Sequence, residues 1–460
     1  MQLLVVFLFL ISGATGLVYE VAWGKYLGLF FGSTAAAHTV VLATFMGGLA
    51  LGNRLFGIVA DRMERRLVLY GLLELGIAAW CLAFPVLVSG LSALYLALAS
   101  TDTAATGNLI LKTVLSVAGI LPPAVLMGGT LPALTRHFTH QVSEIGRTVA
   151  FLYFVNSAGA ALGCLVAGFV LIAALGLDGT MVLTALVNAL VGGVCVWLGR
   201  KPVEAVSSSD STRRPSSARV YSATQQRIVL ALMFASGCVS MLYELVWIRL
   251  LALVMGSSTY SFSIMLFTFI AGISIGALIV SLLSSRIHDP LRWFALAELG
   301  VCVSLAVMIP FYERLPYWFN VLAAVLERKE SLFPMYLILK TAISFGLMLL
   351  PTVLIGMTLP LASAVVSSRL EVLGRSVGGV FSVNTLGNVV GSVGSGFVLI
   401  PAFGLQWGME TGILLSGLIG AVALGTARRG TVRWAWGGGA AATALLVLVL
   451  LKTVSPRWST

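Results

Sequence analysis

The chain has 460 residues, of which 59% are hydrophobic and 10% are charged, and its mean hydropathy is +1.02. Soluble domains carry about 25% charged residues, so this composition excludes an ordinary water-soluble fold and predicts a protein surrounded by lipid. The net charge of +11 does not indicate a nucleic-acid partner, because most Lys and Arg residues lie in short loops between apolar runs.

Long apolar runs follow one another along the chain, without the roughly ten-residue alternation of a membrane barrel. In lipid every backbone polar group must be paired internally, so such runs are predicted to be membrane-spanning helices. The resulting fold class is an all-α, polytopic membrane bundle. The predicted spans in chain order are 3–31, 35–60, 67–98, 109–134, 148–174, 179–198, 227–255, 259–283, 293–324, 336–366, 376–402 and 407–426, with a thirteenth run at 434–451.

The first span needs a separate argument, because residues 1–16 resemble a secretory signal peptide. They have no basic segment before the apolar stretch, and a related segment recurs in the middle of the chain, where cleavage would make no sense. We therefore expect the N-terminal run to stay in the membrane as a helix.

An internal repeat divides the chain into two copies. SGATGLVYEVAW at 12–23 matches SGCVSMLYELVW at 236–247, and LILKT at 109–113 recurs unchanged at 337–341. An even number of spans per copy puts both copies in the same orientation, so we predict two parallel six-helix repeats of major-facilitator type. The predicted parts are a first repeat at 1–200, a linker at 201–226, a second repeat at 227–428 and an extra helix and tail at 429–460.

The basic loops set the predicted orientation. The loops after the even-numbered spans carry most Lys and Arg residues, including Arg62, Arg136 and Arg286. Positive residues favour the cytoplasmic side, so we expect a multi-pass protein of the cell (inner) membrane with a cytoplasmic N-terminus. Its direct partner would be the lipid bilayer.

Charged residues recur at matching positions inside the apolar runs. Glu20, Lys25, Glu74 and Lys112 of the first copy correspond to Glu244, Arg249, Glu298 and Lys340 of the second. A charge at bilayer depth costs at least about 2.5–3.5 kcal/mol, so these side chains should face the bundle interior. We expect Glu20 to pair with Lys112 and Glu244 with Lys340. The glutamates could handle substrate or protons, the pairs could simply lock helices together, or the basic side chains could extend to the interface.

Polar and small residues recur in the fifth span of each copy. Asn156 and Asn384 open the stretches NSAGAALG and NTLGNVVG. The glycines predict close helix packing, and the asparagines are candidates to line a substrate path. The prolines of the fourth span, Pro123 and Pro132 in the first copy and Pro351 and Pro360 in the second, predict a break or kink in that span of each copy.

The loop GIVADRMERR at 57–66 resembles the cytoplasmic loop signature of major facilitator transporters, although any basic loop is an alternative. Its candidate functional residues are Gly57, Asp61, Arg62, Arg65 and Arg66. We expect Asp61 to pair with an arginine or with a helix N-terminus. The second copy has Ser285 in the place of Asp61.

The segments SGATGLVYEVAW, FMGGLALG, GIVADR, SGCVSMLYELVW, FIAGISIG and MTLP together resemble the membrane region of bacterial spermidine-synthase-like proteins, over residues 5–405. In that family a major-facilitator-like domain precedes a soluble aminopropyltransferase domain. The resemblance implies a polyamine connection and a synthase-like enzyme as a separate partner. After Thr426 the sequence offers no such domain, so no catalytic residue is expected.

Three functions follow as hypotheses. The first is transport of a small solute, polyamine-related by resemblance, by alternating access between the two repeats. The second is a non-transporting membrane module that partners a spermidine-synthase-like enzyme. The third, an intramembrane enzyme, lacks a nucleophile or metal cluster in the sequence, and the five cysteines have no metal or redox spacing. We therefore predict no enzyme activity, no cofactor and no metal.

Overall fold

The computed structural model describes residues 1–32, 34–99, 105–200, 221–255, 259–326, 332–367 and 369–427. Within these ranges the chain is helical and contains no strand. The expected all-α membrane bundle is therefore confirmed. Most of the predicted linker and the run at 434–451 lie outside the described residues.

The first repeat contains seven α-helices over residues 2–199 of the described chain. They are α1 (Gln2–Phe31), α2 (Thr34–Arg62), α3 (Arg66–Leu98), α4 (Ala105–Gly128), α5 (Thr130–Phe138), α6 (Ile145–Val166) and α7 (Ile172–Gly199), with a short turn η1 (Val142–Glu144) before α6 and a π-helical turn η2 (Ala167–Leu171) after it. The fourth span breaks at Gly129, three residues before Pro132, as predicted for that proline, whereas α4 continues through Pro123.

The second repeat follows the same order with one helix fewer. Its elements are α8 (Ala223–Met255), α9 (Thr259–Leu283), α10 (Pro290–Leu326), α11 (Phe333–Val366), α12 (Leu373–Val393), η4 (Gly394–Leu399) and α13 (Ile400–Ala427). Here α11 continues through Pro360, so the break predicted for the second copy is wrong. A neighbouring helix or side chain can satisfy the backbone group that a proline leaves unpaired in a membrane.

Ten helical stretches are long and apolar enough to cross a membrane, and two of them, Ile145–Gly199 and Leu373–Ala427, have 55 residues each. A straight helix of that length would measure about 80 Å. Each stretch instead changes direction at a glycine with positive φ, Gly176 (φ 68°) or Gly404 (φ 84°). Because α6 and α7 both pack on α1, and α12 and α13 both pack on α8, each stretch holds two spans. The twelve predicted spans 3–31 to 407–426 are thereby accounted for.

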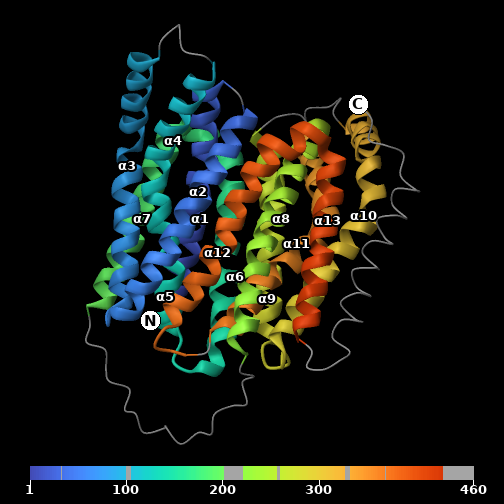
Figure 1. The fold of residues 1–460 in the computed structure, drawn as a ribbon. Helices are drawn as coiled ribbons and strands as arrows, with labels where there is room; N and C mark the ends of the chain where they lie inside the picture. The colour runs from blue at the N-terminus through green and yellow to red at the C-terminus, as the bar shows by residue number, and fades with distance from the viewer. Residues whose placement is uncertain are drawn as a thin grey trace, which may run out of the picture.

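The two repeats pack their helices in the same way. Helix α1 packs on α6 as α8 packs on α12, and α3 packs on α7 as α10 packs on α13. Figure 1 shows the first repeat, in blue and green, beside the second, in yellow and red. Two large contacts join them, α2 with α12 and α6 with α9, which we call the α2–α12 seam and the α6–α9 seam.

Glycines allow close approach at the α2–α12 seam. A Cβ at Gly57 would lie 2.6 Å from the carbonyl oxygen of Gly374, and one at Gly378 would collide with the carbonyl oxygen of Asn53. Small residues let membrane helices pack through their backbones, where dispersion replaces the hydrophobic effect as the source of attraction.

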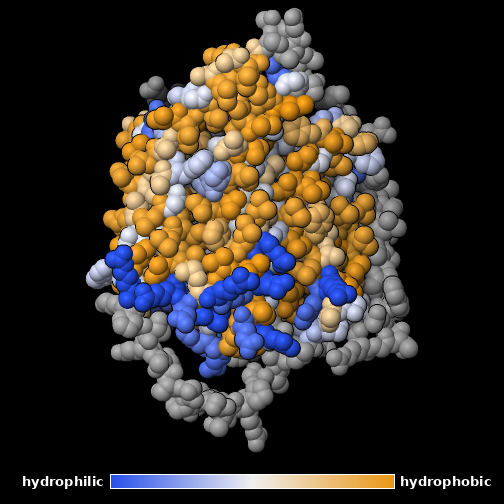
Figure 2. All heavy atoms as spheres, turned by 60° about the vertical axis from the view of Figure 1, so that its left-hand side comes forward, coloured by the Kyte–Doolittle hydropathy of each residue, from blue (hydrophilic) through white to orange (hydrophobic). Residues whose placement is uncertain are grey.

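The outer surface suits a lipid environment. Large apolar side chains are exposed around the bundle, for example Leu3 (83%), Val86 (76%) and Leu253 (76%). Figure 2 shows a broad apolar face, with hydrophilic residues gathered towards one end of the molecule. The chain is a multi-pass membrane protein.

Candidate functional site

A cavity of about 240 Å³ lies between the two repeats. All seven helices of the first repeat, and α8, α9, α11 and α12 of the second, contribute to its wall. Its polar lining comprises Ser12, Thr15, Glu20, Asn53, Thr130, Asn156, Ser157, Asn188, Glu244, Asn384, Thr385 and Asn388. The lining includes two of the recurring pairs of polar residues, Glu20 with Glu244 and Asn156 with Asn384. The volume of the cavity suits a small solute.

Glu20 and Glu244 are the two acidic residues of this cavity. They occupy equivalent positions in α1 and α8, are 4% and 3% exposed, and lie close enough to interact electrostatically. No Lys, Arg or His lines the cavity in the part of the chain that the structure describes. The site therefore offers two buried carboxyl groups, with no basic side chain in the described lining, to a proton or to a positively charged group.

The amide groups form a second feature of the cavity. The predicted residues Asn156 and Asn384 both line it. The sequence reasoning missed Asn53, Asn188 and Asn388, which line it as well. Asn388 lies one helical turn after Asn384, so the helical period of α12 could have identified it.

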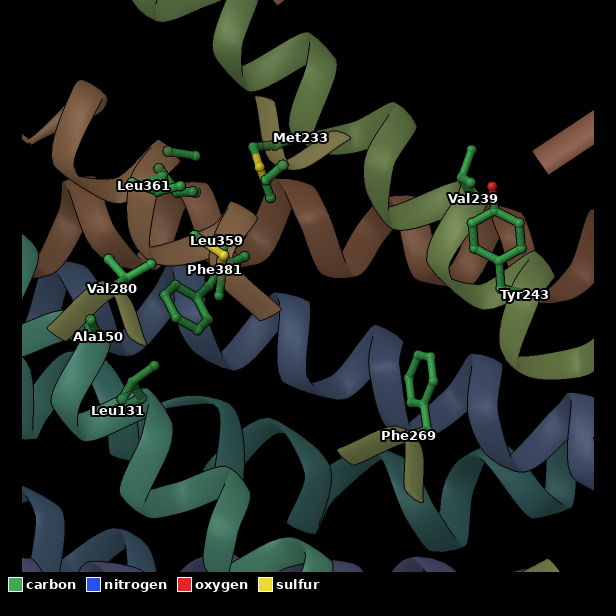
Figure 3. Close-up of a cluster of buried hydrophobic side chains, with 14 of the residues drawn as sticks. Leu131, Ala150, Met233, Val239, Tyr243, Phe269, Val280, Leu359, Leu361 and Phe381 are labelled. Carbon is green, nitrogen blue, oxygen red and sulfur yellow. The ribbon is translucent and has the colours of Figure 1, made fainter. Parts of the chain in front are cut away.

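Aromatic side chains of the two repeats meet at the cavity wall. Tyr153 of α6 and Phe381 of α12 meet across the repeats with ring centroids 5.5 Å apart and planes at 85°. Both lie about two turns after the start of their helices, at the end where α2 reaches Asp61. In Figure 3 Phe381 lies near Leu359, well away from Phe269 of α9, and these three residues all line the cavity.

The other predicted glutamates lie outside the cavity lining. Glu74 accepts hydrogen bonds from Ser12 Oγ at 2.5 Å and Asn188 Nδ2 at 2.6 Å. In the second repeat Ser236 Oγ donates to Glu298 Oε1 at 2.6 Å. These bonds join α3 to α1 and α10 to α8, so both carboxyl groups sit between helices of one repeat, behind the cavity wall.

The predicted pairing of Glu20 with Lys112 is wrong. The Lys112 ammonium lies over the rings of Phe30 and Tyr95, 5.5 and 5.1 Å from their centroids. An ammonium over an aromatic face is stabilised by the ring quadrupole. The pair was predicted from depth alone, and depth does not fix the face of the helix on which a residue lies.

The second repeat repeats this arrangement, so the predicted pairing of Glu244 with Lys340 is also wrong. Lys340 lies over Phe319 and Tyr336, 5.8 and 4.0 Å from the centroids. Arg249 donates from Nη2 to the carbonyl oxygen of Gly396 at 3.0 Å, and Lys25, its counterpart, is half-buried in α1. The basic residues therefore bind rings and backbone, which leaves the cavity carboxylates without basic neighbours in its lining.

The loop motif behaves as predicted at Asp61. Its two oxygens accept hydrogen bonds from the backbone N–H groups of Gly374 and Arg375, both at 2.8 Å, and Arg136 Nε lies 3.6 Å from Oδ1. Gly374 and Arg375 belong to the first turn of α12, so Asp61 of one repeat caps a helix of the other.

The remaining motif residues have local positions. Gly57 gives α2 its close approach to α12, and Arg62 is the last residue of α2. Arg65 precedes α3 and Arg66 is its first residue, and the carbonyl of Arg65 accepts the first backbone bonds of that helix. None of them lines the cavity.

The equivalent contact at the α6–α9 seam is weaker. There Ser281 Oγ donates to the carbonyl oxygen of Arg147 at 3.4 Å, and Ser285 stands in the position of Asp61. Within the described residues no group of three or more His, Cys, Asp or Glu could hold a metal ion.

Two repeats of six membrane spans each, arranged around a polar central cavity, are the fold of membrane transporters. A model of the Major Facilitator Superfamily matches residues 3–392, and the chain belongs to that family. This membership supports a membrane transporter and gives no indication of an enzyme.

Solved structures have the same fold. The human organic anion transporter MFSD10 (TETRAN) is 14% identical, with a TM-score of 0.55 over 90% of this chain and 97% of that one. A variant of the E. coli fucose:proton symporter FucP is 15% identical, with a TM-score of 0.57 over 93% and 98%.

The amino-acid sequence is also similar to that of an enzyme. Polyamine aminopropyltransferase 2 of Streptomyces coelicolor is 31% identical over 230 residues. The match covers 48% of this chain and 37% of that protein, so this chain corresponds to little more than a third of the relative.

Proposed function

We propose that the protein transports a small organic cation across the cell membrane by alternating access, with the cation bound between Glu20 and Glu244. One observation carries the proposal: two buried carboxyl groups from equivalent helices share a cavity whose described lining holds no basic side chain. A cationic substrate would neutralise them and offset part of the cost of keeping charge at this depth.

The arrangement of the two carboxyl groups favours a substrate with more than one positive centre. Each repeat contributes one carboxylate, so two ammonium groups joined by a short apolar chain could each meet one of them. Asn156 and Asn384 are proposed to hydrogen-bond the substrate, and Phe45 and Phe269 of the cavity wall would pack on its methylene groups. The name of the Streptomyces relative supports a polyamine as that substrate.

Alternating access is supported by the way the repeats meet. The contacts between repeats are concentrated in two seams, and Tyr153 and Phe381 of the cavity lining contact each other across the repeats. Rocking about the cavity would separate these contacts and expose Glu20 and Glu244 to the other side. We place the Tyr153–Phe381 end on the cytoplasmic side, with the N-terminus, from the basic loops.

Uptake into proteoliposomes tests the proposal. The full chain would be reconstituted and given radiolabelled spermidine or putrescine, with a neutral sugar as the comparison solute. Glu20→Gln and Glu244→Gln should each reduce uptake at least about tenfold, since a hydrogen bond to a charged group is worth about 1.5–3 kcal/mol. Glu410→Gln is the matched control, because Glu410 is a 7% exposed glutamate of α13 that lies outside the cavity and accepts Gln406 Nε2 at 3.0 Å.

Two results would oppose the proposal. Equal loss in all three variants would indicate that uptake reports folding rather than the cavity. Undiminished uptake by both Glu20→Gln and Glu244→Gln would show that the two carboxyl groups do not bind the substrate.

The second candidate is a non-transporting membrane module for a separate synthase-like enzyme, and the aminopropyltransferase similarity favours it. This function predicts co-purification with such an enzyme from native membranes and no uptake of either polyamine under any imposed gradient. Uptake that depends on Glu20 and Glu244 would decide against it.

A further inference from the structure

A second hollow, of about 310 Å³, lies at the α2–α12 seam, away from the central cavity. Its lining includes Arg54 of α2, Leu230 of α8 and Arg375, Ser376 and Gly379 of α12. Both repeats therefore contribute to it, and its remaining lining is valine. This combination of two arginines with an apolar wall is unlike the acidic central cavity.

The two arginine side chains are exposed, and neither has an acidic partner within 4 Å in the described part of the chain. Arg54 lies eight residues before the end of α2, or about 12 Å along the helix axis. Its guanidinium lies against Gly379, where a Cβ would be 3.7 Å from Nη1. A charge at membrane depth is stabilised by an anion, and the described residues place no carboxylate within 4 Å of either guanidinium.

Asp61 does not fill this role. Its oxygens are already engaged by the backbone N–H groups of Gly374 and Arg375, and the next N–H, that of Ser376, donates to the carbonyl oxygen of Val372. The start of α12 is thus satisfied. The guanidinium groups of Arg54 and Arg375 remain available to an anion from outside the protein.

We propose that this hollow binds the headgroup of an anionic phospholipid. The phosphate accepts hydrogen bonds from Arg54 and Arg375, whose planar guanidinium groups match phosphate oxygens. The acyl chains lie on Leu230, Val372 and Val383, which form the apolar part of the lining. Charge complementarity and the position on an apolar membrane face select a lipid over a soluble anion.

The site exists at only one of the two seams. The repeat counterpart of Arg54 is Leu278, whereas Arg375 has Arg147 as its counterpart. The α6–α9 seam therefore has one arginine where the α2–α12 seam has two. A lipid bound between Arg54 and Arg375 connects α2 to α12 across the repeats and stabilises the closed arrangement of this seam.

Lipid titration of the purified full chain tests the proposal. A fluorescent phosphatidylglycerol would be titrated into the protein in neutral detergent, with phosphatidylcholine as the uncharged comparison. We expect Arg54→Gln and Arg375→Gln to weaken phosphatidylglycerol binding about fivefold each, the value of one basic residue at an anionic membrane surface. Arg147→Gln, the counterpart at the other seam, should change it less than twofold.

The outcomes separate the sources of the anion. If glycerol 3-phosphate displaced the fluorescent lipid as strongly as unlabelled phosphatidylglycerol does, the proposal of a lipid ligand would be overturned and the hollow would be a site for a soluble phosphate. Equal binding by wild type and both variants, or equal loss in Arg147→Gln, would overturn the site itself. If Arg54→Gln fails to fold, Arg375→Gln gives the same test, because Arg375 is on the surface. This experiment does not depend on the transported substrate.

Discussion

Replacing Asp61 by Asn should open the end of the α2–α12 seam at which Asp61 lies. Asp61 is 11% exposed, and it caps α12 with two backbone hydrogen bonds of 2.8 Å. The amide has one oxygen for these two N–H groups, and that oxygen carries no charge. One bond is therefore lost, and the other falls from a charge-assisted to a neutral hydrogen bond.

The magnitude follows from these two changes. Hydrogen bonds to charged groups contribute about 1.5–3 kcal/mol and neutral ones about 0.5–1.5 kcal/mol. The interaction of the carboxylate with the α12 dipole adds about 0.3–1 kcal/mol. The N–H left behind can bind water, since Arg375 is exposed. We expect Asp61→Asn to weaken the closed seam by about 2–3 kcal/mol, or roughly 30- to 150-fold.

Distance measurements between spin labels would check this prediction. Labels at Glu64→Cys and Glu371→Cys, two exposed positions on either side of the seam, report its opening in a background without the five native cysteines. Ser285→Ala, the repeat counterpart, is the control and should leave the distances unchanged. An identical distance distribution for Asp61→Asn and wild type would refute the reasoning.

Three further predictions concern the packing. Gly163→Ala should destabilise the protein by about 1–3 kcal/mol and lower its thermal unfolding midpoint, because the new Cβ would overlap the carbonyl oxygen of Ala14 in α1. Gly193→Ala is the control and should leave the midpoint unchanged, because nothing lies within 4 Å of its Cβ. Gly404→Ala should cost about 1–2 kcal/mol in the same assay, since φ is positive there; an unchanged midpoint would contradict that conformation. Lys112→Met should cost less than about 1 kcal/mol and retain uptake, as expected for a lysine over aromatic rings; a loss of about 3–5 kcal/mol would instead indicate a buried ion pair with Glu20.

The helices and their order could be predicted because the sequence contains the same unit twice. Each span of one copy supports its counterpart, as when Gly176 and Gly404 turn the chain at matching positions. The offset also predicted that Glu20 and Glu244 would occupy equivalent sites. It contained a further signal that was missed: Ser12 and Glu74, and likewise Ser236 and Glu298, are 62 residues apart and bonded.

The partners of the charged residues could not be predicted in the same way. The sequence gives an estimate of the depth of Lys112 and Glu20, because helix length measures distance along the membrane normal. It does not give the rotation of each helix, which depends on packing with neighbours. Lys112 consequently lies over Phe30 and Tyr95, and Glu20 and Glu244 line the same cavity.

The proximity of Arg54 to Arg375 could not be predicted from the sequence either. Arg54 lies eight residues before Arg62 in α2 and has no basic counterpart in the second copy, so neither the repeat nor a motif marks it. Its proximity to Arg375 arises only when α2 packs on α12. Contacts between the repeats are the part of this fold that the duplicated pattern constrains least.

The difference between Asp61 and Ser285 gives the duplicated bundle unequal mechanical strength. A carboxylate clamps the end of one junction between the repeats, while the other junction relies there on a long hydroxyl contact to a backbone oxygen. Any motion that separates the repeats therefore meets less resistance at α6 and α9. The two repeats should therefore rotate about the α2–α12 seam and separate first at the α6–α9 seam. The opening motion will be asymmetric although the helices are arranged with near twofold symmetry.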